Sequence, residues 1–224
     1  FAHETATSLE QILLSVSEAK DISEDQHPDL DALREELKSA SEAGEKVAVW
    51  GKFALNRVKK DKRTKRKTDL KPIFISTIDQ MKPIFASSDI QVQHSISSIS
   101  GKFFAVDIET ILINLLTNAY SAILSSGKNL RSVEVDLKLI TKNSKDFIRI
   151  SVSDTGKGVP SQLKERIFEP LFSSKTDDKG RQIGTGLGLS IVKSIVEDSD
   201  GYISVDKHPT LKGARFLVEL PIRG

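Results

Sequence analysis

The chain has 224 residues, of which 38% are hydrophobic and 29% charged, and its formal net charge at neutral pH is +2. This balance excludes a disordered chain and is ordinary for a globular protein of one or two domains. The small net charge does not draw the whole molecule to nucleic acid, so no nucleic-acid partner is expected. The absence of cysteine excludes disulfides and thiolate metal sites.

No stretch approaches the roughly 18 consecutive apolar residues of a membrane-spanning helix, so we expect no membrane span in this chain. The lack of cysteine fits a reducing compartment, and a cytoplasmic location is expected. Because the first residues already follow an amphipathic pattern, we expect a longer protein with a sensor upstream, whether membrane-bound or not.

Two amphipathic helices are predicted at the start of the chain, over about residues 2–20 and 28–60. Their apolar or small residues recur at alternating spacings of three and four, which is typical of a heptad seam. Two helices cannot enclose such a seam alone, so we expect a homodimer in which two hairpins form a four-helix bundle. The seam consists of Ala2, Thr5, Leu9, Ile12, Val16, Ala19, Leu30, Leu33, Leu37, Ala40, Gly44, Val47, Gly51, Ala54 and Val58.

A basic run follows between residues 59 and 67, with Asp61 as its acidic interruption. No aromatic residue interleaves with the charges, which favours a solvated helix end and linker over a phosphate-binding patch. We therefore predict an N-terminal domain over residues 1–66 and a second domain over residues 67–224.

The second domain mixes helical and strand periodicities. Asp69 and Pro72 are typical of the first turn of a helix. Together, the predicted helices and strands of this domain indicate an α+β sandwich, in which helices cover one face of a mixed sheet. Helices are predicted over about residues 69–81, 107–124 and 187–197, and strands over 90–96, 133–139, 147–152, 202–205 and 215–220.

An acidic turn follows the predicted strand that ends near Val152. Gly156 and Gly158 let the backbone of this turn approach a ligand closely. The carboxylate of Asp154 can accept a hydrogen bond from an exocyclic amine, although a plain Asp-Gly turn looks the same in isolation.

Asn114 and Asn118 are four residues apart, so they share one face of a predicted helix whose buried side carries Ile111, Leu115 and Leu116. Asparagine is a poor residue for a helix interior, and its amide oxygen suits Mg²⁺.

Three glycines, Gly184, Gly186 and Gly188, lead into a helix whose free N–H groups form a natural phosphate cradle. No Gly-Lys-Ser/Thr follows, so this is not a Walker loop. The polar stretch between Phe172 and Gly184 is predicted to be a mobile lid. Its Lys175 and Arg181 are candidate phosphate contacts, with a purely solvated role as the alternative.

Together these motifs resemble the N, G1, G2 and G3 boxes of the superfamily that joins gyrase, MutL and the sensor histidine kinases. Gly213-Ala214-Arg215-Phe216 stands at the last box, and residues 167–172, Ile-Phe-Glu-Pro-Leu-Phe, stand where the kinases carry their F box. The resemblance implies a GHKL (Bergerat) α/β sandwich that binds ATP with Mg²⁺.

By this resemblance Asp154 reads the adenine amino group, Asn118 is the ligand of Mg²⁺ and Asn114 lies at the phosphates. Gyrase and MutL relatives carry a glutamate at the position of Asn114, so ATP hydrolysis is expected to be slow. Phe168 is an expected contact or a core anchor. The remaining nucleotide contacts implied by the resemblance are Gly156, Gly158, Lys175, Gly184, Thr185, Gly186, Leu187, Gly188 and Leu189.

Residues 3–9, His-Glu-Thr-Ala-Thr-Ser-Leu, resemble the H box of histidine kinases, with Ser8 in place of the usual proline. The resemblance implies that His3 accepts the phosphoryl group, that Glu4 orients the imidazole or takes its proton, and that Thr7 positions water during dephosphorylation. It also implies a protein-histidine kinase that passes the phosphoryl group to an aspartate of a response-regulator receiver domain.

Two other functions remain open at this point. One is a nucleotide-gated interaction module in which the hairpin binds a partner and His3 is chemically idle. The other is a gyrase-like ATPase that hydrolyses ATP, which the asparagine at position 114 disfavours.

Overall fold

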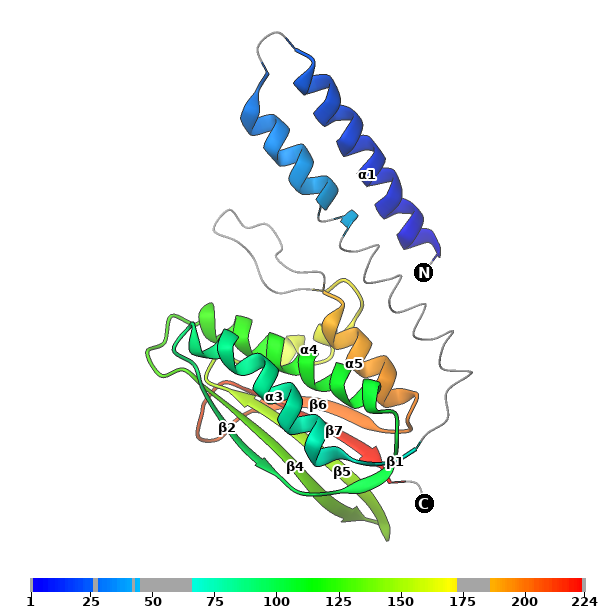
Figure 1. Ribbon diagram of the computed structural model, residues 1–224, viewed down its shortest axis with the longest axis vertical. Helices are drawn as coiled ribbons and strands as arrows, with labels where there is room; N and C mark the ends of the chain where they lie inside the picture. Colours follow the sequence, from blue (N-terminus) through cyan, green and yellow to red (C-terminus); the bar gives the residue numbers. More distant parts are fainter. Residues whose placement is uncertain (1, 26–27, 42, 45–65, 173–185, 223–224) are drawn as a thin grey trace. The chain divides into compact units, whose positions relative to one another are not determined.

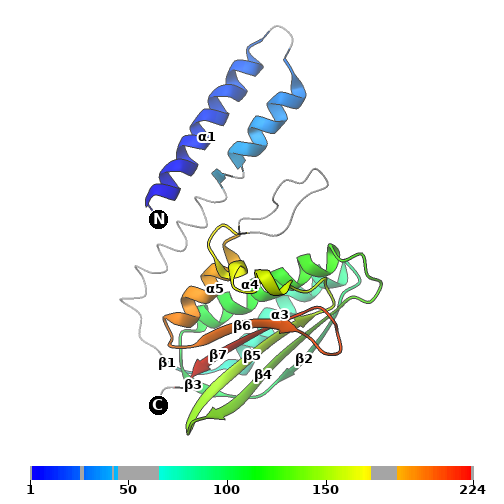
Figure 2. The same ribbon diagram turned by 180° about the vertical axis from the view of Figure 1, so that it is seen from behind.

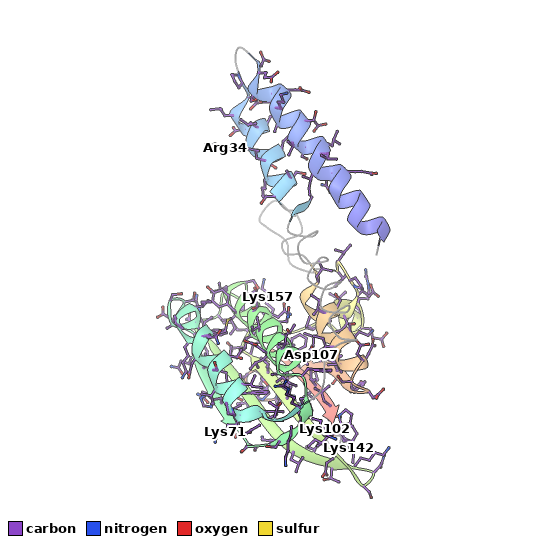
Figure 3. All side chains as sticks on the ribbon, turned by 45° about the vertical axis from the view of Figure 1, so that its right-hand side comes forward. Arg34, Lys71, Lys102, Asp107, Lys142 and Lys157 are labelled. Carbon is purple, nitrogen blue, oxygen red and sulfur yellow. The ribbon has the colours of Figure 1, made fainter. Side chains whose placement is uncertain are left out.

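The computed structural model describes residues 2–25, 28–41, 43–44, 66–172 and 186–222. The chain divides into two compact units, Phe1–Arg63 and Thr64–Gly224 (Figure 1). Charged side chains such as those of Lys71 and Lys142 lie on the surface (Figure 3). Within the described residues, no helix is both long enough and apolar enough to cross a membrane.

The first unit contains two helices that pack side by side. Helix α1 spans Ala2–Ser23, and a second helix covers residues 30–41 and 43–44. The second helix begins where predicted, because the Asp29 carboxylate accepts hydrogen bonds from the N–H groups of Asp31 and Ala32. Its predicted continuation to residue 60 lies outside the described residues.

Small residues form the contact between these two helices. Ser15, Ala19 and Ala43 are buried, and the hydroxyl of Ser15 donates to that of Ser39 over 3.1 Å. Large apolar side chains remain exposed instead: Leu13 is 71% exposed and Leu37 is 54% exposed. One hairpin therefore leaves much of its apolar surface uncovered.

The second unit is built on a mixed five-stranded sheet with the order β2-β4-β5-β7-β6. Only β2 and β4 run parallel; the other neighbours are antiparallel. The strands are β2 (Gln91–Ile96), β4 (Ser132–Lys142), β5 (Lys145–Asp154), β6 (Tyr202–Lys207) and β7 (Ala214–Pro221).

Three helices cover one face of this sheet, as the opposite views of Figures 1 and 2 show: α3 (Leu70–Ala86), α4 (Ala105–Leu124) and α5 (Gly188–Glu197). Helix α3 begins where predicted, because the Asp69 carboxylate accepts a hydrogen bond from the N–H of Lys71. Alternate residues of β4 and β5, such as Val135 and Ile150, meet the buried helix faces. The predicted α+β sandwich is confirmed.

Two short strands and two short helices were not predicted. Strand β1 (Arg66–Asp69) pairs antiparallel with β3 (Ser100–Phe103), so Arg66 and Lys67 belong to a strand and not to the expected linker. The hydrogen bonds between these strands join backbone groups, so the pairing forms regardless of the charged side chains of Arg66 and Lys67, which are exposed. The 3₁₀ helices η1 (Ser161–Leu163) and η2 (Arg166–Phe168) follow the acidic turn.

Candidate nucleotide-binding site

Asp154 is a buried carboxylate at the end of β5, with only 1% of its surface exposed. Its Oδ1 accepts hydrogen bonds from the N–H of Gly156 at 2.7 Å and of Ala214 at 3.2 Å. Its Oδ2 accepts none from the described residues. Since no fully buried side-chain polar atom among the described residues lacks a partner, Oδ2 is not completely buried.

Burial raises the pKa of Asp154 above its ordinary value. The two backbone hydrogen bonds oppose this shift, as does the positive charge of Lys128. The carboxylate is therefore only partly compensated by the protein, and a donor from a ligand would stabilise its charged form further.

Glycine is required on both sides of this carboxylate. A Cβ at Gly213 would lie 2.2 Å from the backbone oxygen of Asp154, and a Cβ at Gly156 would lie 2.8 Å from the Cβ of Ala122 on α4. Any larger residue would displace the carboxylate from its two N–H donors. These contacts explain why the motif that contains Asp154 has glycine at position 156 and why the last motif has glycine at position 213.

Lys128 and Thr155 also hold the acidic turn, and neither was predicted as a site residue. The ammonium of Lys128 donates to the carbonyls of Thr155 at 2.9 Å and of Gly156 at 2.7 Å. The buried hydroxyl of Thr155 accepts from the N–H of Ser132 at 3.0 Å. No local pattern marks Lys128, because its partners lie 27 and 28 residues further along the chain.

The two asparagines lie on α4 as expected. Both are partly buried, and the fully buried Ile111 and Leu115 lie three residues before Asn114 and Asn118, on the adjoining part of the helix surface. The Nδ2 of Asn114 donates to the carbonyl of Thr110 at 2.8 Å. This bond turns Oδ1 of Asn114 toward the start of α5, where a Cβ at Gly188 would lie only 2.7 Å away.

One face of α4 therefore connects the two glycine-rich motifs. Asn114 adjoins Gly188 at the start of α5, and Ala122 adjoins Gly156 in the acidic turn. Asn118 lies between them on the same face, one helical turn from each. With a rise of about 1.5 Å per residue, this face spans about 12 Å, which suits an extended ligand.

The segment that enters α5 packs on the end of the predicted F box. Gly186 has φ +62°, and a Cβ there would lie 2.4 Å from the carbonyl carbon of Leu171. Leu187 is buried and Leu189 packs against the core. This packing fixes the backbone N–H groups at the start of α5 relative to α4.

Phe168 is a core residue. It is 7% exposed, and its ring meets the ring of Phe216 edge-on with centroids 6.4 Å apart. The neighbouring Phe172 lies beneath the guanidinium of Arg166 at 4.8 Å. Phe168 was predicted to be either a nucleotide contact or a core anchor, and its burial agrees with the core anchor. A direct nucleotide contact by this ring stays a prediction.

Several predicted residues fall outside what the structure describes. Lys175, Arg181, Gly184, Thr185 and the predicted lid lie outside the described residues. The backbones of residues 3, 4 and 7 belong to α1, but the side chains of His3, Glu4 and Thr7 are not described. Their roles remain predictions.

Residues 105–224 match the family described as histidine kinase-, DNA gyrase B-, and HSP90-like ATPase. The chain belongs to this ATPase family. The match begins at the first residue of α4 and covers more than half of the chain, including Asp154, both asparagines and the glycine-rich motifs.

Two curated relatives carry the same ATPase unit. The two-component sensor PprA of Pseudomonas aeruginosa is 36% identical over 118 residues, which are 53% of this chain and 12% of PprA. The sensor histidine kinase ZraS of Klebsiella oxytoca is 36% identical over 117 residues, which are 52% of this chain and 22% of ZraS. The chain thus spans less than a quarter of the length of either relative.

A solved structure shares the fold over nearly the whole chain. The Acinetobacter baumannii histidine kinase AdeS matches with a TM-score of 0.64 at 16% identity, over 99% of this chain and 98% of that one. At this identity the likeness shows the fold alone.

The described side chains of the second unit do not form a complete metal site by themselves. No cluster of three or more His, Cys, Asp or Glu side chains able to hold an ion occurs among the described residues. The amide oxygens of the two partly buried asparagines on α4 fit Mg²⁺, which binds oxygen and keeps waters and phosphate oxygens as its other ligands. The residues present therefore fit Mg²⁺ bound together with a nucleotide.

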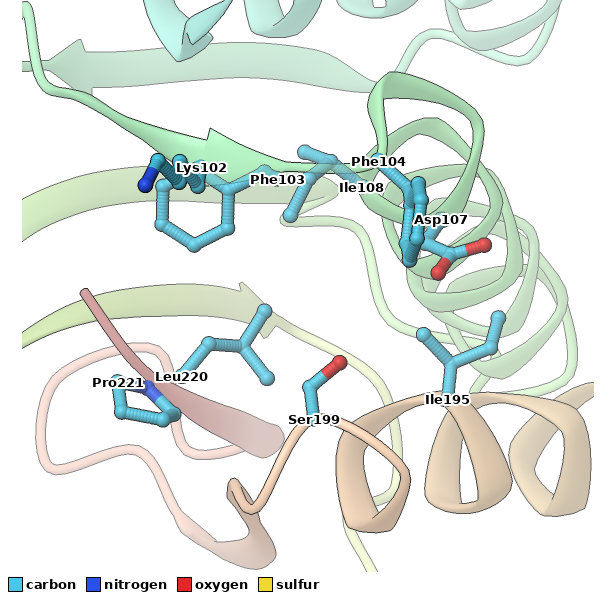
Figure 4. Close-up of a pocket in the computed structure, with 9 residues that line it drawn as sticks. All are labelled: Lys102, Phe103, Phe104, Asp107, Ile108, Ile195, Ser199, Leu220 and Pro221. Carbon is cyan, nitrogen blue, oxygen red and sulfur yellow. The ribbon is translucent and has the colours of Figure 1, made fainter. Parts of the chain in front are cut away.

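A small pocket lies elsewhere in the ATPase unit, between β3, the start of α4, the end of α5 and β7 (Figure 4). Lys102, Asp107, Ser199 and Leu220 are among its lining residues. It has room for about one water molecule, and a nucleotide does not fit. Leu220 pairs with Ile148, six residues along β5 from Asp154, so the pocket is separate from the candidate site.

Proposed function

We propose that this chain is the catalytic core of a two-component sensor histidine kinase, which uses Mg-ATP to phosphorylate its own His3. The observation that carries the proposal is the buried carboxylate of Asp154, with Oδ1 held by two backbone N–H groups and Oδ2 left for a ligand. The kinase names of the relatives that share this unit support it.

In the proposed complex, Oδ2 of Asp154 accepts a hydrogen bond from the exocyclic amino group of adenine. A purine with a carbonyl at that position would bring an acceptor against a buried carboxylate, which costs free energy on both sides. The site therefore selects ATP over purine nucleotides with a 6-oxo group. Gly156 and Gly158 are proposed to lie beside the base, whereas Gly213 packs against Asp154 and keeps its carboxylate in place.

Asn118 is the proposed ligand of Mg²⁺, and Asn114 lies beside the phosphates. When bound, the ion supplies positive charge that neutralises the phosphate oxygens during transfer. The proposed phosphate contacts are the backbone N–H groups of Gly186, Leu187, Gly188 and Leu189, which lie at or just before the start of α5. Gly184, Thr185 and Lys175 are proposed to complete this cradle.

In the proposed transfer, an imidazole nitrogen of His3 attacks the γ-phosphorus of ATP. A nitrogen–phosphorus bond forms, the bond from the γ-phosphorus to the bridging oxygen breaks, and ADP leaves with that electron pair. The proton on the other ring nitrogen is lost to a base, for which Glu4 is the adjacent candidate. The phosphoryl group then moves to an aspartate of a receiver domain, and Thr7 positions water when that aspartate is dephosphorylated.

A hydrolysing ATPase needs a base that activates water, and the amide of Asn114 cannot accept a proton at neutral pH. Its Nδ2 is already bound to the carbonyl of Thr110, and its Oδ1 adjoins Gly188. An amide in place of a base at position 114 supports transfer to a protein acceptor over transfer to water.

A single-turnover reaction distinguishes these functions. Excess protein is mixed with γ-labelled ATP and Mg²⁺, and ADP, free phosphate and protein-bound phosphate are followed in time. The kinase produces one protein-bound phosphate for each ADP before free phosphate appears. Free phosphate that rises with ADP from the start, without a phosphoprotein, would instead establish a gyrase-like ATPase.

A further inference from the structure

The turn between β6 and β7 positions one of the two backbone N–H groups that donate to Asp154. It runs over residues 208–213, and the first residue after it, Ala214, donates its N–H to Oδ1 of Asp154. Gly213 packs so closely on Asp154 that a Cβ would lie 2.4 Å from the same oxygen. A shift of this turn would therefore change the position of the carboxylate directly.

His208 fixes the conformation of this turn with both its backbone and its side chain. Its N–H donates to the carbonyl of Gly213 at 3.0 Å, and its carbonyl accepts from Lys212 at 3.1 Å. The imidazole Nδ1 accepts a third hydrogen bond from the N–H of Leu211 at 3.0 Å. This last bond supports a strained turn, because Lys212 has φ +65°.

The imidazole also contacts the sheet. Because Nδ1 is an acceptor, the proton of the neutral ring resides on Nε2, which lies 3.8 Å from Oε2 of Glu134. Only 15% of the His208 side chain is exposed. Glu134 pairs with Ser153, the residue immediately before Asp154. The ring therefore lies between the turn and the strand end that carries the carboxylate.

We propose that His208 is a positioning residue for adenine recognition: its Nδ1 holds the β6–β7 turn in the conformation that presents Ala214 N–H to Asp154. His208 has no contact with the base in this account and acts through the turn. The inference rests on the proposed ATP-binding function. The sequence alone gives His208 no functional context, because Glu134 and the end of β5 become its neighbours only in the fold.

Two substitutions of His208 distinguish the role of its hydrogen-bond acceptor, Nδ1, from that of the rest of the imidazole ring. His208→Ala removes Nδ1 and leaves the N–H of Leu211 without its partner. His208→Asn keeps an acceptor, because Oδ1 of asparagine is as many bonds from the backbone as Nδ1 of histidine, and asparagine commonly accepts backbone N–H groups in turns. His94→Ala is the matched control, since His94 is an exposed histidine on β2 of the same sheet.

The test compares the affinities of these proteins for ATP and for inosine triphosphate, which lacks the exocyclic amino group. Loss of a hydrogen bond that positions a buried carboxylate is expected to weaken ATP binding about fivefold in His208→Ala. His208→Asn and His94→Ala are expected to bind ATP within about twofold of the wild type. The affinity for inosine triphosphate is expected to stay unchanged in all of them.

Three results would overturn the inference: unchanged ATP affinity in His208→Ala, an equal loss for both nucleotides, or a loss that asparagine does not restore. A second measurement needs no variant, because ¹⁵N spectra of the wild type report whether the neutral ring carries its proton on Nε2. The opposite tautomer would also refute the proposal. Failure of the proposed function has a different signature, in which the wild type itself does not prefer ATP to inosine triphosphate.

Discussion

Two opposing requirements meet in the side chain of Asp154. Recognition of an amino group requires an ionised acceptor, whereas burial penalises ionisation and raises the pKa of this carboxyl. Two backbone N–H groups and the charge of Lys128 reduce the penalty without using Oδ2. The residue is thus arranged for binding at a cost in stability, as is common at functional sites.

The raised pKa of Asp154 makes the stability of the folded protein depend on pH. Because the pKa of Asp154 is raised in the folded state, the folded protein binds this proton more readily than the unfolded chain. The stabilisation from this group is complete below the ordinary value of 3.8 and is lost as the pH rises through the folded pKa. At neutral pH the ionised carboxylate therefore lowers the free energy of unfolding.

Asp154→Asn is expected to separate binding from stability. Asparagine keeps an oxygen for the two backbone donors but offers an N–H₂ where Oδ2 was, so ATP affinity should fall about tenfold to hundredfold. Without nucleotide, its free energy of unfolding at pH 7 should equal or exceed that of the wild type, and this difference should shrink as the pH falls toward 3.8. Calorimetric binding and denaturant titrations measure both quantities; unchanged ATP affinity would refute the adenine assignment.

Gly213→Ala tests the close approach of the last glycine motif to Asp154. The added Cβ meets backbone, which cannot yield as a flexible side chain does, so a loss of about 1–3 kcal/mol in stability is expected together with weaker ATP binding. Gly127→Ala is the control, because its site has φ +67° but no atom within 4 Å of the new Cβ. Both variants should lower the melting temperature. Only Gly213→Ala should weaken nucleotide binding, and equal affinities would contradict the account.

At the scale of elements, the two units differ in how much of their apolar surface they bury within one chain. The sheet buries its inner face beneath α3, α4 and α5 within one chain. The hairpin joins its two helices through Ser15, Ala19 and Ala43. Four of its described leucines are exposed: Leu13, Leu14, Leu30 and Leu37. An uncovered apolar face of this kind supports the proposed homodimer.

Leu37→Glu is expected to weaken that dimer. Burying a leucine contributes about 1.5–3 kcal/mol, and a symmetric interface buries it twice, so the dimer dissociation constant should rise at least about a hundredfold. Lys38→Glu is the matched control, because Lys38 is the exposed neighbour and the new residue is the same. Light scattering across a concentration series measures the effect. A wild-type monomer, or equal dissociation constants for the two variants, would argue against the dimer.

The elements also show what the sequence could predict. Helix α3 and the β4–β5 hairpin carry clear periodicities, and both occur where expected. Strands β1 and β3 were missed because each has only four residues and is stabilised by pairing with the other. In the site, Asp154 and Gly156 belong to one motif and were predicted together. Ala214 donates the second backbone hydrogen bond to Asp154 from 60 residues away, and this contact could not be predicted without the fold.

At the scale of the whole molecule, the proposed phosphoacceptor and the nucleotide site belong to different compact units. His3 lies in Phe1–Arg63, and Asp154 and both asparagines lie in Thr64–Gly224. In the proposed reaction the γ-phosphoryl group must reach His3 in the same chain or in the partner subunit. Transfer to a histidine is therefore the central claim, and nucleotide binding alone does not establish it.

The most direct test incubates the purified chain with γ-labelled ATP and Mg²⁺ beside His3→Ala, and follows protein-bound label under acid and under alkali. The account predicts label on the wild type that survives alkali and is lost in acid, as expected for a phosphohistidine, and no label on His3→Ala. Equal labelling of the two proteins would move the acceptor elsewhere. No label on a wild type that demonstrably binds ATP would contradict autophosphorylation and favour a nucleotide-gated interaction module.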